Sequence, residues 1–266
     1  MSRLRGELTR KAVHIGMGGF ALLLRWLTPW QAAGLAIGAL LFNLFVLHRL
    51  TRRALLRDNE RGSGFSLGIV LYPAMVLALI VVFRDRLELA AACWGLLAVG
   101  DGMATVAGVL SKGGKLPWNP QKSWAGFLAF VLNGTVAAAF LIRWTQQAAL
   151  DATPAQGSVG FSFLLADAEG DRFLFLIAGC FCAATAAAFA ESLQTGIDDN
   201  ILVPLVGGAF LYAATLVQPG LLELRGDTLF DAFLWGAAIN AVLAALAFAE
   251  LLPAVASGWV RLLPSR

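Results

Sequence analysis

The chain has 266 residues, of which 59% are hydrophobic and only 14% are charged, and its formal net charge is +3. Its mean hydropathy of +0.74 excludes an ordinary soluble domain and indicates a protein of the lipid bilayer. Most of the basic residues lie between apolar runs, so they favour contacts with anionic lipid headgroups and argue against a nucleic-acid partner.

The apolar runs predict the fold class. A helix needs roughly 20 mostly apolar residues to cross a hydrocarbon core of about 30 Å. The sequence therefore predicts an all-α, polytopic integral membrane helical bundle with about eight transmembrane helices, forming a single transmembrane domain over residues 1–266. The expected spans are residues 12–28, 30–48, 65–83, 89–110, 124–142, 173–190, 201–218 and 231–252. Since the first run is short, contains Arg25 and is followed by no small-residue cleavage site, we expect no signal peptide.

The loop charges predict the orientation. With a cytoplasmic amino terminus and eight spans, most of the 20 basic residues fall on the cytoplasmic side, as the positive-inside rule requires. We therefore expect a multi-pass protein of a prokaryotic cell (inner) membrane. The sequence does not specify an oligomeric state, and a homo-oligomer is compatible with it.

Asp101 lies inside the fourth apolar run. An aspartate near the centre of a membrane helix costs roughly 2.5 to 3.5 kcal/mol, so it usually faces a cavity, an ion or a polar partner. On a helix, Thr105 and Gly108 lie on the same face as Asp101. We interpret Asp101 as a ligand of Mg²⁺, which takes one or two carboxylates together with water and phosphate oxygens. The alternative is a structural aspartate that is hydrogen-bonded to neighbouring helices.

The loop over residues 111–123, called the lysine loop below, is rich in cations. It contains Lys112, Lys115 and Lys122, with two adjacent glycines and two prolines. Lysines neutralise phosphates, and glycines let backbone N–H groups approach them. The loop lacks the spacing of a Walker A motif. The alternative interpretation is a positively charged anchor that contacts lipid headgroups.

Acidic residues lie between the sixth and seventh runs. Glu191 ends the sixth run, and Asp198, Asp199 and Asn200 precede the seventh. Carboxylates this close in sequence repel one another unless a cation is nearby, although surface solvation is an alternative. Either Asp198 or Asp199 can also cap the seventh helix. Because the predicted topology places this loop, the lysine loop and the inner end of the fourth run on one side, we expect Asp101 and these acids to surround a shared magnesium ion.

Several short motifs together resemble the CTP-dependent lipid kinases, the group that comprises phytol kinase, dolichol kinase and the yeast-type diacylglycerol kinase. Each motif is short, but their order and shared side make the combination specific. They are Glu7-x-x-Arg10-Lys11-x-x-His14, Arg61-Gly62 followed by Tyr72-Pro73, Gly100-Asp101-Gly102-x-Ala104 with Gly108, Lys122-Ser123-x-x-Gly126, and Glu191 with Asp198-Asp199-Asn200 and Pro204.

The resemblance implies a single transmembrane catalytic domain that transfers the γ-phosphate of CTP to the hydroxyl of a membrane isoprenoid alcohol of the phytol or polyprenol type. It implies Mg²⁺ dependence, a site on the cytoplasmic side and a lipid substrate that enters sideways from the bilayer. The expected metal ligands are Asp101, Glu191, Asp198 and Asp199. The expected nucleotide-binding residues are Arg10, Lys11, His14, Lys112, Lys115, Lys122, Ser123 and Asn200. The expected catalytic residues are Asp101, Asp198 and Lys122, and either aspartate can accept the hydroxyl proton.

Two other functions fit part of the sequence. A phosphatidate cytidylyltransferase of the CDP-diacylglycerol synthase type also uses CTP and Mg²⁺, but its usual signature is absent, and its nearest echo, Asp85-Arg86-Leu87-Glu88, falls on the predicted outer side. A membrane transporter would also place an aspartate in a span. The two halves of the chain, residues 1–130 and 131–266, show no inverted repeat of the kind that many transporters contain.

Overall fold

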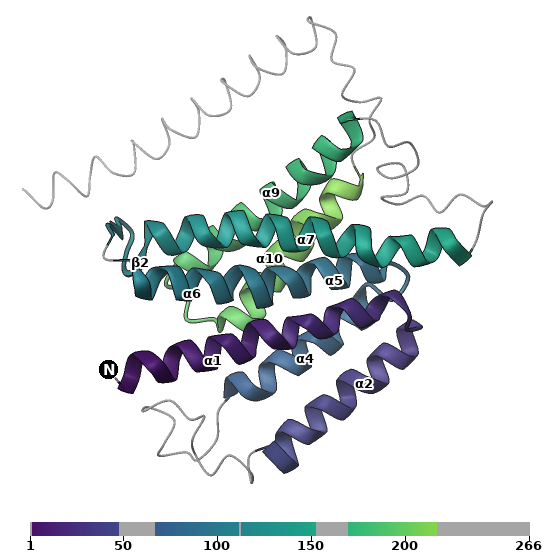
Figure 1. Ribbon diagram of the computed structural model, residues 1–266, viewed down its shortest axis with the longest axis horizontal. Coiled ribbons are helices and arrows are strands. Elements are labelled where there is room, and N and C mark those ends of the chain that lie inside the picture. Colours follow the sequence, from purple (N-terminus) through teal and green to yellow (C-terminus); the bar gives the residue numbers. More distant parts are fainter. Residues whose placement is uncertain (1, 48–66, 112, 153–169, 217–266) are drawn as a thin grey trace, which may run out of the picture. The chain divides into compact units, whose positions relative to one another are not determined.

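The computed structural model describes residues 2–47, 67–111, 113–152 and 170–216, which belong to one compact unit, Met1–Leu216 (Figure 1). The eighth expected span, residues 231–252, lies outside the described residues, as do Arg61, Gly62 and Lys112. The number of eight spans therefore stays a prediction.

The described residues form helices and one short hairpin. In chain order the elements are α1 (Ser2–Gly18), the 3-10 helix η1 (Gly19–Arg25), α2 (Pro29–Phe42), the π-helical turn η2 (Asn43–Leu47), α4 (Leu67–Val82), α5 (Leu87–Gly95), the π-helical turn η3 (Leu96–Gly100), α6 (Asp101–Leu110), β1 (Lys115–Leu116), β2 (Asn119–Ser123), α7 (Trp124–Ala152), α9 (Gly170–Ser192) and α10 (Asp199–Leu216).

The all-α membrane class is confirmed. Five helical stretches are long and apolar enough to cross a membrane, namely Pro29–Leu47, Leu87–Leu110, Trp124–Gln146, Phe173–Ser192 and Asp199–Leu216. A shorter apolar helix covers Gly68–Val82. The expected span over residues 12–28 is divided between the end of α1 and the 3-10 turns of η1. It is not among these five stretches because α1 carries several charged side chains.

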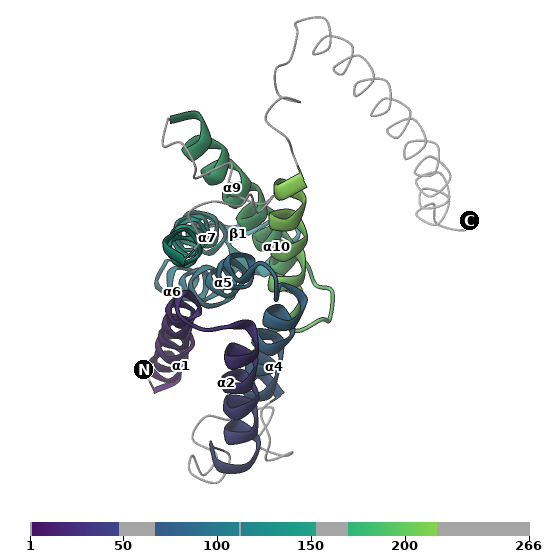
Figure 2. The ribbon, with the colours of Figure 1, turned by 90° about the vertical axis from the view of Figure 1, so that its right-hand side faces the viewer.

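The centre of this unit is the continuous stretch of α5, η3 and α6. Its residues from Leu89 to Ala98 are buried, and the stretch packs against α7 on one side and α10 on another (Figure 2). Small residues allow this close approach, as in many membrane bundles. At Gly207 of α10, for example, an added Cβ would lie 2.5 Å from Leu96 Cδ1. The remaining described helices extend this core, with α9 packed on α7 and α10, and α2 packed on α4.

The lysine loop contains a hairpin that the sequence analysis did not predict. Strands β1 and β2 pair antiparallel immediately before α7. The Gly126 N–H donates to Ser123 Oγ at 3.2 Å, so this hydroxyl caps the start of α7. The hairpin is also attached to the end of α9, because Trp118 Nε1 donates to Ser192 Oγ and Asn119 Nδ2 donates to the Ser192 carbonyl, both at 2.9 Å.

Candidate metal and phosphate site

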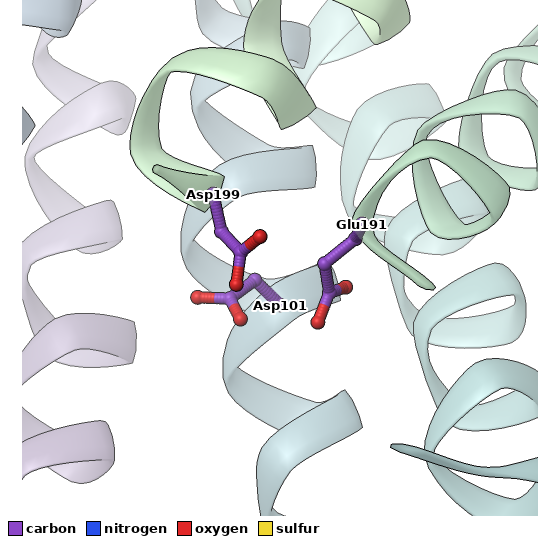
Figure 3. Close-up of side chains that lie close together, drawn as sticks. All are labelled: Asp101, Glu191 and Asp199. Carbon is purple, nitrogen blue, oxygen red and sulfur yellow. The ribbon is translucent and has the colours of Figure 1, made fainter. Parts of the chain in front are cut away.

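Three carboxylates from three helices meet at one point. Asp101 is the first residue of α6, Glu191 is near the end of α9, and Asp199 begins α10. One carboxylate oxygen from each lies within 4.8 Å of the others, and the three side chains point toward one another (Figure 3). Asp101 and Glu191 are buried, whereas the Asp199 side chain is 43% exposed. The structure thus brings Asp101 together with two of the three expected acids, Glu191 and Asp199, and a shared magnesium ion stays a prediction.

Two lysines form ion pairs with this carboxylate cluster. Lys11 Nζ lies 2.7 Å from Asp101 Oδ2. Lys122 Nζ lies 2.5 Å from Glu191 Oε1 and 3.6 Å from Asp199 Oδ2. Burial lowers the pKa of the Lys122 ammonium, but the Glu191 and Asp199 carboxylates outweigh burial and hold that pKa above its ordinary value. Lys122 is therefore a cation throughout the physiological pH range.

A π-helical turn positions Asp101. The Asp101 N–H donates to the carbonyl of Leu96, five residues earlier, and Leu97 O instead accepts a hydrogen bond from His14 Nε2 at 2.9 Å. The same His14 nitrogen lies 3.3 Å from Asp101 Oδ2. Since both partners are acceptors, Nε2 carries the hydrogen. His14 therefore donates to Leu97 O and lies beside the Asp101 carboxylate. Such π-helical turns occur frequently at functional sites.

Glycines allow α1 to approach Asp101. An added Cβ at Gly102 would lie 2.3 Å from Ile15 Cγ1, and one at Gly18 would lie 2.4 Å from Ala98 Cβ. A larger residue at either position would push α1 away from α6 and η3. This close packing brings Lys11 and His14 to the carboxylate. Arg10 precedes Lys11 on the same helix.

The remaining expected site residues have other positions. Asp198 Oδ1 accepts hydrogen bonds from the backbone N–H and side-chain amide of Asn200, at 2.9 and 2.7 Å, and thereby caps α10. The structure thus divides the two adjacent aspartates, with Asp199 in the carboxylate cluster and Asp198 at the helix cap. Ser123 is buried and caps α7.

Sequence reasoning missed several residues that support the site. Trp94 Nε1 donates to the Tyr72 hydroxyl at 2.8 Å, and the Tyr72 ring meets the His14 ring edge-on, with 4.6 Å between ring centroids. In the sequence, Tyr72 stands out only as part of the short motif Tyr72-Pro73. Trp118 and Asn119, which attach the hairpin to α9, had no signal beyond lying in a turn-rich loop.

A cavity of about 480 Å³ adjoins the carboxylate cluster and shares Lys122 and Glu191 with it. Its walls come from α6, the hairpin, α7 and the end of α9, and Lys115 is part of its lining. Lys115 therefore lies near the site, although it is exposed and is not paired with the cluster in the way that Lys122 is.

The donor set of the carboxylate cluster fits a hard divalent cation. Carboxylate oxygens are the ligands that Mg²⁺ prefers, and one or two of them usually suffice when phosphate is also bound. Together, the fold and the site define a polytopic helical membrane protein in which three carboxylates from α6, α9 and α10 are paired with two lysines.

Comparison with known proteins places the chain beside lipid kinases. It is 31% identical over 213 residues to "Probable phytol kinase 3, chloroplastic" of Glycine max, and the match covers 75% of this chain and 60% of that protein. It is 28% identical over 226 residues to "CTP-dependent diacylglycerol kinase 1" of Schizosaccharomyces pombe, covering 77% and 92%. It is also 28% identical over 220 residues to "Phytol kinase" of Synechocystis sp., covering 80% and 82%.

These relatives confirm the resemblance to the CTP-dependent lipid kinases. The chain spans between 60% and 64% of the length of the plant phytol kinases that it matches. No family model matches the chain, and no solved structure does.

Proposed function

We propose that this protein is a CTP-dependent lipid kinase that transfers the γ-phosphate of CTP to the hydroxyl of a membrane isoprenoid alcohol. The observation that carries the proposal is the meeting of Asp101, Glu191 and Asp199 within 4.8 Å. The names of the relatives support the reaction class, since they include phytol kinases, a farnesol kinase and a diacylglycerol kinase described as CTP-dependent.

Asp101, Glu191 and Asp199 would hold the magnesium ion. When bound, Mg²⁺ neutralises charge on the phosphate oxygens of CTP. Three carboxylates with two lysine partners leave a net negative charge, and this favours a divalent cation at the cluster. Asp198 is a weaker candidate ligand because its Oδ1 already accepts two hydrogen bonds from Asn200.

Lys11 and Lys122 would bind phosphate. Phosphoryl transfer depends mainly on positioning and on charge neutralisation, so ammonium groups beside the transferred phosphate are suited to this reaction. Each lysine contacts an acid of the cluster, at 2.7 Å for Lys11 and 2.5 Å for Lys122. Lys115 would assist from the hairpin.

The hydroxyl oxygen of the lipid attacks the γ-phosphorus of CTP, the bond to the oxygen that bridges the β- and γ-phosphates breaks, and CDP leaves. The hydroxyl proton passes to a carboxylate, for which Asp101 is the stronger candidate. It lies in the cluster, where His14 and Lys11 orient it, whereas Asp198 is engaged at the start of α10.

The substrate would enter sideways from the bilayer at the cytoplasmic side. This orientation is supported by the basic amino-terminal segment and the lysine-bearing hairpin, both of which lie at the end of the helices where the carboxylates meet. Isoprenoid alcohols of the phytol or polyprenol type are the proposed substrates because phytol kinases and a farnesol kinase are among the relatives.

Purified protein in detergent micelles, incubated with CTP, Mg²⁺ and a lipid alcohol, tests the proposal. We expect CDP and a phosphorylated lipid to form, with phytol, farnesol, a polyprenol and diacylglycerol compared in parallel. Reactions with EDTA or without lipid serve as controls. Release of pyrophosphate in place of CDP would identify a cytidylyltransferase and contradict the kinase assignment, and so would the absence of CTP turnover with every lipid.

A further inference from the structure

Aromatic side chains gather on the outer surface of the hairpin, beside the carboxylate cluster. Trp118, in the turn of the hairpin, lies 5.6 Å from Trp124 of α7 and 5.7 Å from Phe189 of α9, measured between ring centroids. The three residues are between 40% and 48% exposed. None of them takes part in the proposed reaction. We call these three residues the aromatic patch.

We propose that the aromatic patch and the hairpin lie in the headgroup layer of the membrane leaflet next to the carboxylate cluster. The partner of this surface is the phospholipid layer itself. Tryptophan rings are enriched at this level of membrane proteins because they are amphipathic. Lys115, which is exposed on the hairpin, is complementary in charge to the phosphate groups of anionic lipids at the same level.

Three spanning helices reach their ends around the aromatic patch. The apolar stretch of α6 ends at Leu110, that of α7 begins at Trp124, and that of α9 ends at Ser192. Beside these ends, Leu110 is 64% exposed and Leu128 is 54% exposed. Leucines on the outside of a spanning helix face acyl chains. The lipid-facing surface of the helices therefore continues up to the aromatic patch, so a bilayer that covers the helices also reaches the patch.

The length of α7 supports this level independently. Trp144 follows Trp124 by 20 residues on this helix, which begins directly after β2 (Figure 1), so the two positions are about 30 Å apart along its axis at 1.5 Å per residue. A typical hydrocarbon core is also about 30 Å thick. At the far end of α7, the Trp144 ring lies 5.6 Å from the ring of Trp26, which is 64% exposed. The helix therefore carries aromatic groups at both expected interfaces.

The same levels give the depth of the carboxylate cluster. Helices α6 and α7 meet where a Cβ added at Gly126 would lie 2.8 Å from the Ala104 carbonyl oxygen. Gly126 follows Trp124 by two residues, and Asp101 precedes Ala104 by three. Asp101 therefore lies roughly 7 Å closer to the bilayer centre than Trp124. A consequence that rests on the proposed function is that the hydroxyl of a lipid alcohol, held at the headgroup level, reaches Asp101 by a short path without leaving the bilayer.

Fluorescent labels at three exposed positions test this placement. Cys182→Ser removes the exposed native cysteine, whereas Cys93 and Cys180 are buried. Single cysteines are then introduced and labelled with bimane as Gln121→Cys on the hairpin, Leu128→Cys near the start of α7, and Leu132→Cys, which is 63% exposed in the wild-type protein and is the deep control on the same helix.

The labelled proteins are reconstituted in vesicles of phosphatidylcholine and phosphatidylglycerol that contain a lipid with a nitroxide on the headgroup, at a shallow acyl position or at a deep acyl position. We expect these three probes to quench the labels at positions 121, 128 and 132, respectively, most strongly. Because four residues of α7 correspond to about 6 Å of depth, each preferred probe should quench about 2-fold more than either of the others.

Three results would overturn the proposal. A label at position 121 that iodide in the buffer quenches and the headgroup nitroxide does not would place the hairpin outside the membrane. Strongest quenching at positions 121 and 128 by the deep probe would place the aromatic patch inside the hydrocarbon core. Protection of both positions from iodide and from every nitroxide would show that protein covers the patch. Since none of these measurements uses CTP, a protein that gives the expected ranking without CTP turnover would contradict the proposed function alone.

Discussion

Charged side chains have different kinds of partner at the two ends of the described helices. At the end of η1, Arg25 lies over the Trp144 ring, with its Cζ atom 4.6 Å from the ring centroid, and donates to the Trp144 carbonyl. At the start of α5, Arg86 donates to Thr215 Oγ1 at 2.9 Å and lies 3.6 Å from Glu88. At the other end, three carboxylates from α6, α9 and α10 are gathered and share two lysines.

From this difference we infer that Arg25 and Arg86 have a structural role, whereas the carboxylate cluster has a functional one. Aromatic rings and single partners anchor cations where a helix leaves the membrane, and this arrangement stabilises the position of the helix. Like charges gathered in a buried place repel one another and lose hydration, so packing alone does not favour them. We therefore propose that the carboxylate cluster binds a cation, and the following predictions test that distinction.

The largest effect should follow neutralisation of Asp101. Asp101→Asn should lower the rate of CDP release at least about 100-fold, because a charged group at the reacting centre is lost. The midpoint of thermal unfolding should move by less than about 4 °C, since lost repulsion from Glu191 and Asp199 offsets the lost Lys11 pair. Glu88→Gln, at the opposite end, is the matched control and should leave turnover unchanged. A wild-type rate in Asp101→Asn would refute a reactive role for this carboxylate.

Removal of Lys122 should affect both activity and stability. Lys122→Met leaves Glu191 and Asp199 without their cation, so we expect turnover to fall about 30-fold or more. The free energy of unfolding should fall by about 1 to 2 kcal/mol, less than for a fully buried pair because the Lys122 side chain is 36% exposed.

The pH dependence of this stability has a defined sign. The pKa of Lys122 is raised above the ordinary value of 10.5, so its contribution is present below that pH and is lost only as the pH rises through the higher folded-state value. The stabilities of the wild-type protein and Lys122→Met, measured by denaturation, should therefore not converge as the pH rises from 6 to 9. Convergence of the two curves within that range would contradict the assignment.

An intermediate effect is expected where α1 packs on α6. Gly102→Ala introduces a Cβ that would lie 2.3 Å from Ile15 Cγ1, so α1 must shift and carry Lys11 and His14 away from Asp101. We expect a loss of about 10-fold in turnover and of about 1 to 3 kcal/mol in stability, as for an overpacked core. Gly38→Ala is the control, because nothing lies within 4 Å of a Cβ there. Equal behaviour of the two variants would show that the approach of α1 is not required.

The smallest effect is expected at Tyr72. Tyr72→Phe leaves the buried Trp94 N–H without its acceptor, which should lower the free energy of unfolding by about 1 to 3 kcal/mol. Turnover should fall only about 3-fold, since the ring still packs against His14. Tyr212→Phe, at a 47% exposed position, is the control for loss of a hydroxyl and should change neither quantity. Chemical denaturation and the CDP assay measure both values.

The sequence predicted the membrane class and the central acids for clear physical reasons. Long apolar runs leave few alternatives to spanning helices, and an aspartate within such a run must have a polar partner. The positive-inside rule then predicted that the acidic loop and the lysine loop share a side, and the structure brings Asp101 together with Glu191 and Asp199.

Other features depend on three-dimensional packing and could not be predicted. The choice between Asp198 and Asp199 depends on which side chain turns back to cap α10, a matter of local backbone geometry. The hairpin of the lysine loop is stabilised by contacts of Trp118 and Asn119 with Ser192, far away in the sequence. Likewise, the contacts of Lys11 and His14 with Asp101 depend on the close approach of α1 to α6 that Gly102 allows.

The π-helical turn Leu96–Gly100 inserts one extra residue into the long helix formed by α5 and α6. The side chains of α6 are therefore rotated relative to those of α5. Each residue of an α-helix turns the side chain by roughly 100°. Deleting one residue from this turn would restore a regular helix, keep the buried face of α5 in place and rotate Asp101 away from Glu191 and Asp199. The register of this segment, and not only its composition, therefore determines whether the acids can act together. Insertions and deletions here should be far less tolerated than substitutions among its apolar side chains.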